Sequence, residues 1–347
     1  MTSKGLVLVT GVNGYIGART VEAFLTAGYS VRGTARSRSS THDTVDALKA
    51  YADRLEIVEV PDITIPGAFD EAVKGVDAIA HLAAPVAMSF TDPEPVMKAA
   101  IEGTTRVLKS AIKEPSIKSF VFMSSVAAIR SEKPDGYVFT EADWNTQAED
   151  IVAQQGKDAP GPVIYYASKT AAEKALWKFR DEYKPKFTVT ALNPCLVAGP
   201  PLVRPTSPSN IPFTTKSIWE VYTGTPLDDS SITSFFSAFV DVRDVARMVV
   251  FAVDHPEKAD GERFLLASHY SPPQAVADIL REQFPEQRGV IQEGNPGEGY
   301  YMPGYGFPVE RMVYDGTKAV RVSGRGYTPW EETVRDTVLS AGGVARE

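Results

Sequence analysis

The feature that most constrains the fold is a regular alternation of short apolar runs with longer segments of helical periodicity. The apolar runs cover residues 6–10, 30–35, 55–60, 78–83, 119–125, 188–194 and 263–267. Several are apolar throughout, which is typical of strands that helices cover on both faces. Residues 14–27, 97–113 and 164–183 lie between them and repeat apolar side chains at helical spacing. The alternation predicts an α/β fold with a doubly wound parallel sheet.

The alternation stops after residue 199, and this change marks the expected domain boundary. Residues 200–212 hold five prolines and show no periodicity. Helical patterns return at 214–223, 241–254, 272–284 and near Pro329. We expect a sheet domain made of residues 1–199 and 236–268. Residues 200–235 and 269–347 would form a smaller lobe at its C-terminal edge.

Charge and cysteine content exclude several classes of protein. The formal net charge of −8, from 36 basic and 44 acidic residues, would repel a nucleic acid. The single cysteine, Cys195, excludes an internal disulfide framework and a cysteine zinc cage, and nothing else in the sequence supports metal binding. No apolar run approaches the ~20 residues that span a bilayer. We therefore expect a cytoplasmic protein without metal, nucleic acid or membrane partners.

A glycine-rich turn follows the first apolar run and opens the first helical segment. Gly11 permits a tight turn, Gly14 lets the backbone approach a pyrophosphate, and Gly17 lets the helix pack on the strand. The helix N-terminus would face the phosphates with unpaired N–H groups. In this context the turn predicts a Rossmann-type dinucleotide site, although it could also be a bare strand–turn–helix connection. The expected contacts are Gly11, Asn13, Gly14, Tyr15, Ile16 and Gly17.

The residues after the second apolar run bear on the choice between NAD and NADP. An acidic residue there would bind the ribose hydroxyls of NAD. The sequence instead has Arg36 and Ser37, and the next carboxylate is Asp43. A guanidinium and a hydroxyl suit a 2′-phosphate, so we expect NADPH or NADP as cofactor, the alternative being a solvated basic loop.

Asp62 and Ile63 follow the third apolar run, at the same expected edge of the sheet. The Asp62 carboxylate could accept a hydrogen bond from the adenine amine. It could equally cap the next helix. Both residues are carried forward as candidate cofactor contacts.

Tyr165 and Lys169 form the candidate proton-transfer pair. They stand four residues apart in a helical segment, so they share one helix face. An unperturbed tyrosine has a pKa of about 10, and a nearby ammonium and an oxidised nicotinamide would both stabilise its phenolate. Such a tyrosine can protonate a carbonyl oxygen as hydride arrives at carbon. The alternative is an exposed pair of side chains that stabilises its helix by only ~0.2–0.5 kcal/mol.

A second Tyr-x-x-x-Lys motif, at Tyr314 and Lys318, competes with this pair. An Asp-Gly turn signal inside it means that its tyrosine and lysine need not share a helix face. The first motif has a third partner, because Ser124 and Ser125 close the fifth apolar run at the edge where such sheets bind ligands. A hydroxyl there could bind the substrate oxygen, or it could only form a turn.

Together these motifs resemble the extended short-chain dehydrogenase/reductases, and most closely the fungal and yeast carbonyl reductases of aldehydes and methylglyoxal. Plant dihydroflavonol and cinnamoyl-CoA reductases are relatives of that group. The likeness extends over about residues 5–340 and also rests on Val31–Ser37, Val60–Ile63, Phe122–Ser125, Ala172–Ala175, Asn193–Pro194 and Asp241–Ala246. It implies an NADPH-dependent reductase of aldehydes and ketones, with NADP in the sheet domain and the substrate in the lobe.

The resemblance also implies roles for individual residues. It makes Ser125, rather than Ser124, catalytic together with Tyr165 and Lys169. Pro194 and Val197 would line the nicotinamide, and Ala83 and Pro85 would pass beside the cofactor. Val126 and Leu196 depart from residues common in relatives at positions that face the substrate. The substrate specificity of the relatives therefore cannot be assigned to this chain.

Two other functions remain open at this point. A nucleotide-sugar epimerase or dehydratase would use the same scaffold, but Val126, Ala127 and Ala128 follow Ser125 where dehydratases usually place acidic residues. A cofactor-sensing regulator would keep the glycines without the catalytic set. Fold alone does not separate these functions.

The remaining candidates have plainer interpretations. We expect His81 to be a structural histidine and Cys195 to be a packing residue. Aromatic residues in 213–239 would favour a substrate with an apolar group if they line a cleft, although aromatics are also common in cores. They are Phe213, Trp219, Tyr222, Phe235, Phe236 and Phe239. We expect a small carbonyl compound as substrate and a monomer or homodimer.

Overall fold

The computed structural model describes residues 3–230, 238–311, 313–342 and 344. Its main sheet has seven strands in the order β10-β7-β5-β4-β1-β2-β3. These strands are β1 (Leu6–Thr10), β2 (Ser30–Ala35), β3 (Leu55–Glu59), β4 (Ala78–His81), β5 (Ser119–Met123), β7 (Thr188–Pro194) and β10 (Arg263–Leu266). The chain moves outward from β1 in one direction and then from β4 in the other, so the predicted doubly wound parallel sheet is confirmed.

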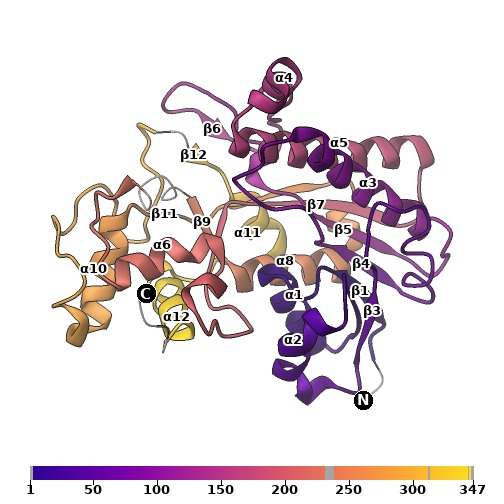
Figure 1. Ribbon diagram of the computed structural model, residues 1–347, viewed down its shortest axis with the longest axis horizontal. Helices are drawn as coiled ribbons and strands as arrows, with labels where there is room; N and C mark the ends of the chain where they lie inside the picture. The colour runs from indigo at the N-terminus through magenta and orange to yellow at the C-terminus, as the bar shows by residue number, and fades with distance from the viewer. Residues whose placement is uncertain (1–2, 231–237, 312, 343, 345–347) are drawn as a thin grey trace. The chain divides into compact units, whose positions relative to one another are not determined.

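Helices cover both faces of this sheet. The helices α3 (Pro93–Ala111) and α5 (Gly161–Tyr183) pack together over one face, and α1 (Tyr15–Thr26) lies on the other (Figure 1). Helix α3 begins at the N-cap Asp92, whose carboxylate accepts a hydrogen bond from the Glu94 N–H at 3.1 Å. Helix α8 (Val242–Asp254) follows strand β9 (Ala238–Asp241). The shorter helices α2 (His42–Ala47) and α4 (Thr146–Gln155) were not predicted, because their apolar periodicity is weak.

A continuous apolar core lies between the sheet and the helices α3 and α5. Its strand residues include Leu8, Ile79 and Phe120, and its helix residues include Leu108 and Leu176. Each of these side chains is fully buried. Burying a side chain of this size contributes about 1.5–3 kcal/mol, so the core holds the strand ends, and the loops that follow them, in fixed positions.

The chain divides into two compact units. The first comprises Met1–Glu132, Phe139–Asn193 and Ala246–Leu265, and it contains most of the seven-stranded sheet. The second comprises Lys133–Val138, Pro194–Val245 and Leu266–Glu347. The assignment of NADP binding to the predicted sheet domain and of substrate binding to the predicted lobe stays a prediction.

The second unit has its own small sheet and helices. Strands β8 (Leu196–Ala198), β9 (Ala238–Asp241) and β11 (His269–Tyr270) form a three-stranded sheet, and β6 (Val138–Phe139) pairs with β12 (Val313–Tyr314). The helices of the second unit are α6 (Phe213–Tyr222), α10 (Pro273–Gln283), α11 (Thr317–Ser323) and α12 (Trp330–Ser340), whereas the short helix α9 (Pro256–Ala259) belongs to the first unit. Phe239 packs on Trp330 with ring centroids 4.8 Å apart, inside a core formed with α6, α10 and α12.

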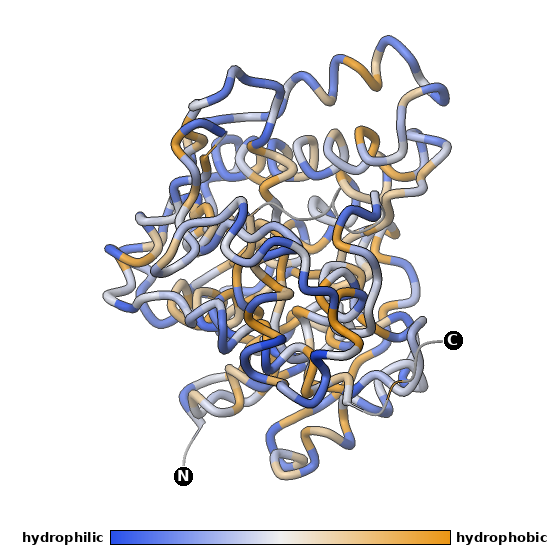
Figure 2. The backbone as a smooth tube through the Cα atoms, turned by 90° about the vertical axis from the view of Figure 1, so that its left-hand side faces the viewer, coloured by the Kyte–Doolittle hydropathy of each residue, from blue (hydrophilic) through white to orange (hydrophobic). Residues whose placement is uncertain are grey.

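Polarity along the described chain follows this arrangement. In Figure 2 the hydrophobic stretches lie mostly inside the trace and the outer turns are mostly hydrophilic. None of the helices formed by the described residues combines the length and the apolar character needed to cross a membrane.

Candidate active site

The glycine turn after β1 is built by close backbone contacts. Gly11 adopts a φ of +72°, a left-handed conformation that favours glycine. A Cβ atom on Gly17 would lie 2.0 Å from the Gly11 carbonyl oxygen, so no larger residue fits without moving the turn. The Gly14 N–H donates to that same oxygen at 3.0 Å. These contacts bring the start of α1 directly onto the end of β1.

The N-terminus of α1 fits an anionic group. Its N-cap is Gly14, which has no side chain to cap the helix, and its first turn holds no acidic residue. Asn13 and Gly14 are exposed, while Tyr15 and Ile16 are half-buried. An open helix N-terminus of this kind attracts a phosphate through its N–H groups and its dipole. The residues present therefore fit the pyrophosphate of a dinucleotide.

Thr10 and His81 fix the loop that starts with Leu82 and Ala83. The Thr10 hydroxyl oxygen accepts hydrogen bonds from the Leu82 and Ala83 N–H groups, both at 3.0 Å. Its own proton therefore goes to His81 Nδ1, 2.8 Å away, which makes His81 a neutral acceptor. Burial lowers the pKa of His81 to about 3, in agreement with this state. His81 is thus a structural histidine, as the sequence predicts.

Arg36 and Ser37 follow β2, and Asp62 and Ile63 come shortly after β3. Arg36 is exposed and Ser37 is half-buried. Asp62 Oδ1 accepts hydrogen bonds from the Thr64 N–H at 2.8 Å and the Thr64 hydroxyl at 2.7 Å, and these bonds lower the pKa of Asp62. Asp62 therefore stabilises a turn rather than a helix start. Its proposed bond to adenine remains a prediction.

Ser125 and Tyr165 meet at the C-terminal end of β5. Tyr165 lies on α5 and is buried, and its hydroxyl lies within hydrogen-bonding reach of the Ser125 side chain. Burial raises the pKa of Tyr165, while the bond to Ser125 acts in the opposite direction. Ser125 Oγ accepts the Ala127 N–H at 3.1 Å and keeps its own proton for donation. A serine O–H that donates to the tyrosine oxygen favours the phenolate, which agrees with the direction in which Ser125 acts on the pKa of Tyr165. The tyrosine proton then remains available for a substrate.

Lys169 lies one helical turn after Tyr165 and is equally buried. Its Nζ donates to the Met123 carbonyl oxygen at 3.3 Å, at the end of β5. Burial lowers the pKa of Lys169 to about 8, and the nearby Glu173 carboxylate partly offsets that effect. The expectation was that Lys169 would lower the pKa of Tyr165, whereas burial is the largest influence on that pKa and raises it.

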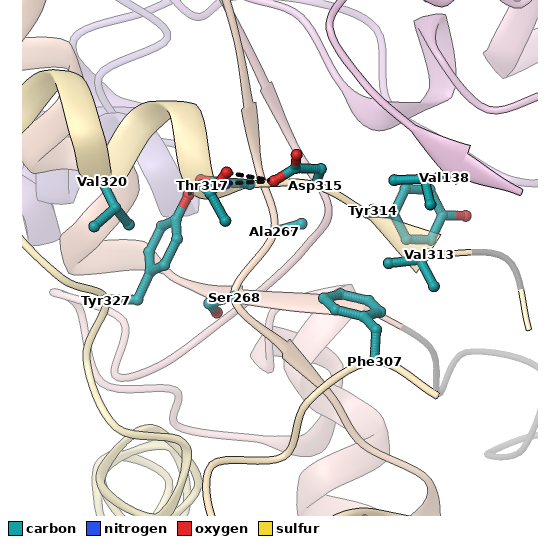
Figure 3. Close-up of a pocket in the computed structure, with 11 residues that line it drawn as sticks. Val138, Ala267, Ser268, Phe307, Val313, Tyr314, Asp315, Thr317, Val320 and Tyr327 are labelled. Atoms are coloured by element: carbon teal, nitrogen blue, oxygen red, sulfur yellow. Dashed lines mark hydrogen bonds between the residues drawn. The ribbon is translucent and has the colours of Figure 1, made fainter. Parts of the chain in front are cut away.

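The competing motif at Tyr314 lies in the second unit and is not a helix pair. Tyr314 belongs to β12, whereas Lys318 belongs to α11. Between them, Asp315 Oδ1 accepts hydrogen bonds from the Thr317 N–H and hydroxyl, at 3.0 Å and 2.6 Å. Figure 3 shows Tyr314 on the wall of a pocket of about 320 Å³, with its hydroxyl pointing away from Thr317. The turn predicted from Asp-Gly is confirmed.

Several residues that were predicted to contact the cofactor or the substrate do not belong to the group formed by Ser125, Tyr165 and Lys169. Pro194 ends β7, and Leu196 and Val197 lie in β8 of the second unit, so their roles beside nicotinamide and substrate stay predictions. Val126 is half-buried and begins the turn after Ser125. Pro85 is likewise half-buried, in the loop after β4. Cys195 is buried, as a packing residue would be.

The aromatic residues of 213–239 give little support to an apolar substrate. Trp219 and Phe239 are buried in two hydrophobic clusters, and Tyr222 packs against the cluster that contains Phe239. Phe213 is 47% exposed. Phe235 and Phe236 lie outside the described residues. The interpretation of these aromatics as core therefore holds for Trp219, Tyr222 and Phe239.

One buried residue of the site was missed in the sequence. Glu173 lies one turn beyond Lys169 on α5, is fully buried, and accepts a hydrogen bond from Arg263 Nε at 2.6 Å. Its spacing of eight residues from Tyr165 places it on the same helix face. A charged residue at that position was the signal that could have identified it.

Comparison with known proteins identifies the family of the chain. The family model described as "NAD dependent epimerase/dehydratase family" matches residues 7–267. The chain belongs to this family. The predicted membership of the extended short-chain dehydrogenase/reductases is thereby confirmed.

Several relatives of the chain are named as reductases. Over 199 residues the chain is 41% identical to aldehyde reductase 2 of Sporidiobolus salmonicolor, with 56% of this chain and 58% of the relative covered. Over 340 residues it is 30% identical to the ketoreductase sphI of Aspergillus fumigatus, with 96% of each covered. Yeast methylglyoxal/isovaleraldehyde reductase Gre2, solved with NADPH, is 27% identical with a TM-score of 0.81, covering 97% of this chain and 98% of Gre2.

Proposed function

We propose that the protein is an NADPH-dependent reductase that converts aldehydes or ketones to alcohols. The observation that carries the proposal is the placement of the buried Tyr165 hydroxyl within reach of the Ser125 side chain at the end of β5, one helical turn from Lys169. The open N-terminus of α1 and the exposed Arg36 support the choice of NADPH. The named reductases among the relatives support the same reaction.

Each residue of the site has its own role in the reaction. When bound, NADPH supplies a hydride to the carbonyl carbon. The Tyr165 O–H donates its proton to the carbonyl oxygen, so that an alcohol forms and no charge remains on the oxygen. The raised pKa of Tyr165 keeps it protonated at neutral pH, which is the form that reduction requires. Ser125 orients the tyrosine, and the Lys169 ammonium supplies the positive charge that stabilises a phenolate.

The two alternative functions have less support. A dehydratase site usually has acidic groups beside the catalytic hydroxyl, whereas Val126, Ala127 and Ala128 follow Ser125. A regulator that only senses the cofactor would have no use for a buried Ser125–Tyr165 pair. A cytoplasmic location, a monomer or homodimer, and an apolar group on the substrate remain predictions.

A substrate panel tests the proposal. The purified protein is mixed with aldehydes, ketones and a nucleotide-diphosphate sugar, each with NADPH and with NADH, and the absorbance of the reduced nicotinamide is followed. The proposal predicts oxidation of NADPH with at least one carbonyl compound and slower oxidation of NADH. Binding of NADPH without oxidation in every case would favour the regulator, and epimerisation of the sugar would favour the epimerase.

A further inference from the structure

A single carboxylate, that of Glu173, joins the helix that carries Tyr165 to the strand end that carries Ser125. Glu173 Oε2 accepts hydrogen bonds from the Ser124 hydroxyl at 2.5 Å and from Asn193 Nδ2 at 2.7 Å. Glu173 Oε1 accepts one from Trp177 Nε1 at 3.3 Å in addition to that from Arg263. The carboxylate is fully buried, so each of these bonds is shielded from water.

Two of these bonds reach the backbone on which Ser125 stands. Ser124 is its neighbour in the chain. Asn193 Nδ2 also donates to the Ser125 carbonyl oxygen at 3.2 Å. Because a carboxylate and a carbonyl are both acceptors, the chemistry fixes the Asn193 amide with its NH₂ group toward them. Glu173 is thus linked to Ser125 by two routes. One runs through Ser124, the preceding residue in the chain, and the other through Asn193, which donates both to the Glu173 carboxylate and to the Ser125 carbonyl oxygen.

The same carboxylate lies on the helix face of Tyr165 and Lys169. Residues 165, 169 and 173 are spaced four apart on α5, so they follow one another along that face. Any shift of Glu173 relative to Ser124 and Asn193 would change the separation of Tyr165 from Ser125. The carboxylate is therefore placed where it can set that separation.

Arg263 forms a buried ion pair with the carboxylate. Its guanidinium donates to Glu173, to the carbonyl oxygens of Glu141 and Asp143 at 2.5 Å and 2.7 Å, and lies 3.9 Å from the centre of the Trp144 ring. Removing a carboxylate from water is costly unless it is paired and hydrogen-bonded, and Arg263 supplies that pairing here. The ion pair therefore maintains the acceptor on which Ser124 and Asn193 depend.

We propose that Glu173 is a positioning residue of the reductase, which fixes the Ser125 hydroxyl against Tyr165 through Ser124 and Asn193. This inference rests on the proposed function, because it concerns the same catalytic group. It assigns to Glu173 no contact with substrate or cofactor. It predicts that loss of the carboxylate lowers turnover more than substrate or cofactor binding, since misplacement of a reacting group by about 1 Å can cost 10²-fold.

The first test compares Glu173→Gln with Glu149→Gln, a matched control. Glu149 accepts a hydrogen bond from Lys174, the residue next to Glu173 on α5, but outside the network. We expect Glu173→Gln to lower kcat about 10-fold or more, with KM and the Kd for NADPH changed less than threefold. Glu149→Gln should keep kcat within about twofold. Equal effects of the two variants, or a wild-type kcat for Glu173→Gln, would overturn the inference.

The pH dependence of kcat provides a second test, because a residue that only stabilised the fold would leave that dependence unchanged. The charged or titratable groups that act on Lys169 are Glu173 from α5 and His81 from β4. His81 stays neutral above pH 4, so only Glu173 supplies a charge near neutrality. Its loss in Glu173→Gln should shift the alkaline fall of kcat to lower pH. An unshifted profile would contradict the inference.

A double-mutant cycle tests the route through Asn193. We expect Asn193→Ala and Glu173→Gln each to lower kcat, and the double variant to be little worse than the poorer single one, because the two residues act in one chain of contacts. Losses in kcat that multiply in the double variant would contradict a shared chain of contacts.

Unfolding by urea is measured for each variant as a control for folding. If Glu173→Gln does not fold, it is replaced by two other variants, Ser124→Ala and the double variant Glu173→Gln with Arg263→Gln.

A spectroscopic measurement separates this inference from the proposed function. The protein is labelled with ¹³C at the tyrosine ring carbon that bears the hydroxyl, and the Tyr165 signal is assigned with Tyr165→Phe. Glu173→Gln should shift that signal without any substrate, because the bond to Ser125 changes. An unchanged signal overturns the inference even in an active enzyme, whereas a shifted signal in a protein that reduces no carbonyl overturns only the proposed function.

Discussion

The side chains of Ser125 and Tyr165 lie within hydrogen-bonding reach of each other, although one follows a strand and the other lies on a helix. Ser125 lowers the pKa of Tyr165, as a serine O–H that donates to the tyrosine oxygen would, and in that arrangement the tyrosine keeps its own proton for a substrate. The arrangement presents one O–H donor, of raised pKa, to any carbonyl oxygen that reaches the strand end. It is the chemical basis of the proposed reduction.

Lys169 is expected to limit activity at alkaline pH and to reduce stability. Its pKa of about 8 lies below the ordinary value of a lysine, so the unfolded chain binds an extra proton between about pH 8 and 10.5. The free energy of unfolding should therefore rise with pH in that window, while turnover falls as the ammonium loses its proton. Urea unfolding and kcat are measured across pH.

The variant Lys169→Met checks both effects. It should lack the rise in stability, unfold at higher urea concentration than the wild type at pH 7, and lose at least about 10²-fold in kcat. A variant that is both less stable and fully active would contradict the role given to this lysine.

Arg36 is expected to determine the preference for NADPH. Arg36→Asp would place a like charge against the 2′-phosphate and offer a carboxylate to the ribose hydroxyls of NADH. We expect KM for NADPH to rise at least about 10-fold and KM for NADH to change much less. Lys49→Asp, an exposed position with the same change of charge, serves as control. Equal losses with both cofactors would reject this role of Arg36.

Gly17 is expected to be required for cofactor binding. A methyl group at this position meets the Gly11 carbonyl oxygen at 2.0 Å, so Gly17→Ala must displace the glycine turn. We expect the Kd for NADPH to rise about 10-fold or more, which corresponds to about 1.4 kcal/mol. Gly289→Ala is the matched control, because a Cβ there meets nothing within 4 Å. Fluorescence titration with NADPH measures both, and unaltered affinity in Gly17→Ala would refute the phosphate site.

His81 is expected to make the fold sensitive to acid. Its folded pKa of about 3 lies below the unfolded value of about 6.5, so the unfolded chain binds the extra proton between these limits. Stability is therefore fully present above pH 6.5 and falls by about 1.4 kcal/mol per pH unit below it. Subtracting the profile of His81→Asn from that of the wild type isolates this slope. A difference that is flat from pH 7 to pH 4 would show that His81 is not buried neutral.

The sequence predicts the parts of this protein whose signals are local. The apolar runs place β1, β2 and β7 at their observed bounds, and the spacing of Tyr165 and Lys169 places both on one helix face. The Asp-Gly signal correctly separates Tyr314 from Lys318. Each of these features depends on neighbours within a few residues, which is why a single sequence reveals them.

The network around Glu173 could not be predicted in the same way. Its partners Ser124, Asn193 and Arg263 lie on three different strands or strand ends, and only the packing of the sheet against α5 brings them together. The direction of the Tyr165 pKa was also missed, because it depends on burial of the side chain rather than on the nearby lysine. Both features arise from tertiary contacts, which sequence spacing does not encode.

The most direct test of the account compares Tyr165→Phe with Tyr314→Phe, because the chain carries the same motif twice. NADPH oxidation is followed with a carbonyl compound that the wild type reduces, alongside urea unfolding and NADPH binding. We predict that Tyr165→Phe keeps its fold and NADPH affinity but loses about 10²–10⁴-fold in kcat, while Tyr314→Phe stays within a few-fold of the wild type. Near-normal turnover in Tyr165→Phe would contradict the assignment of the proton donor and, with it, the proposed mechanism.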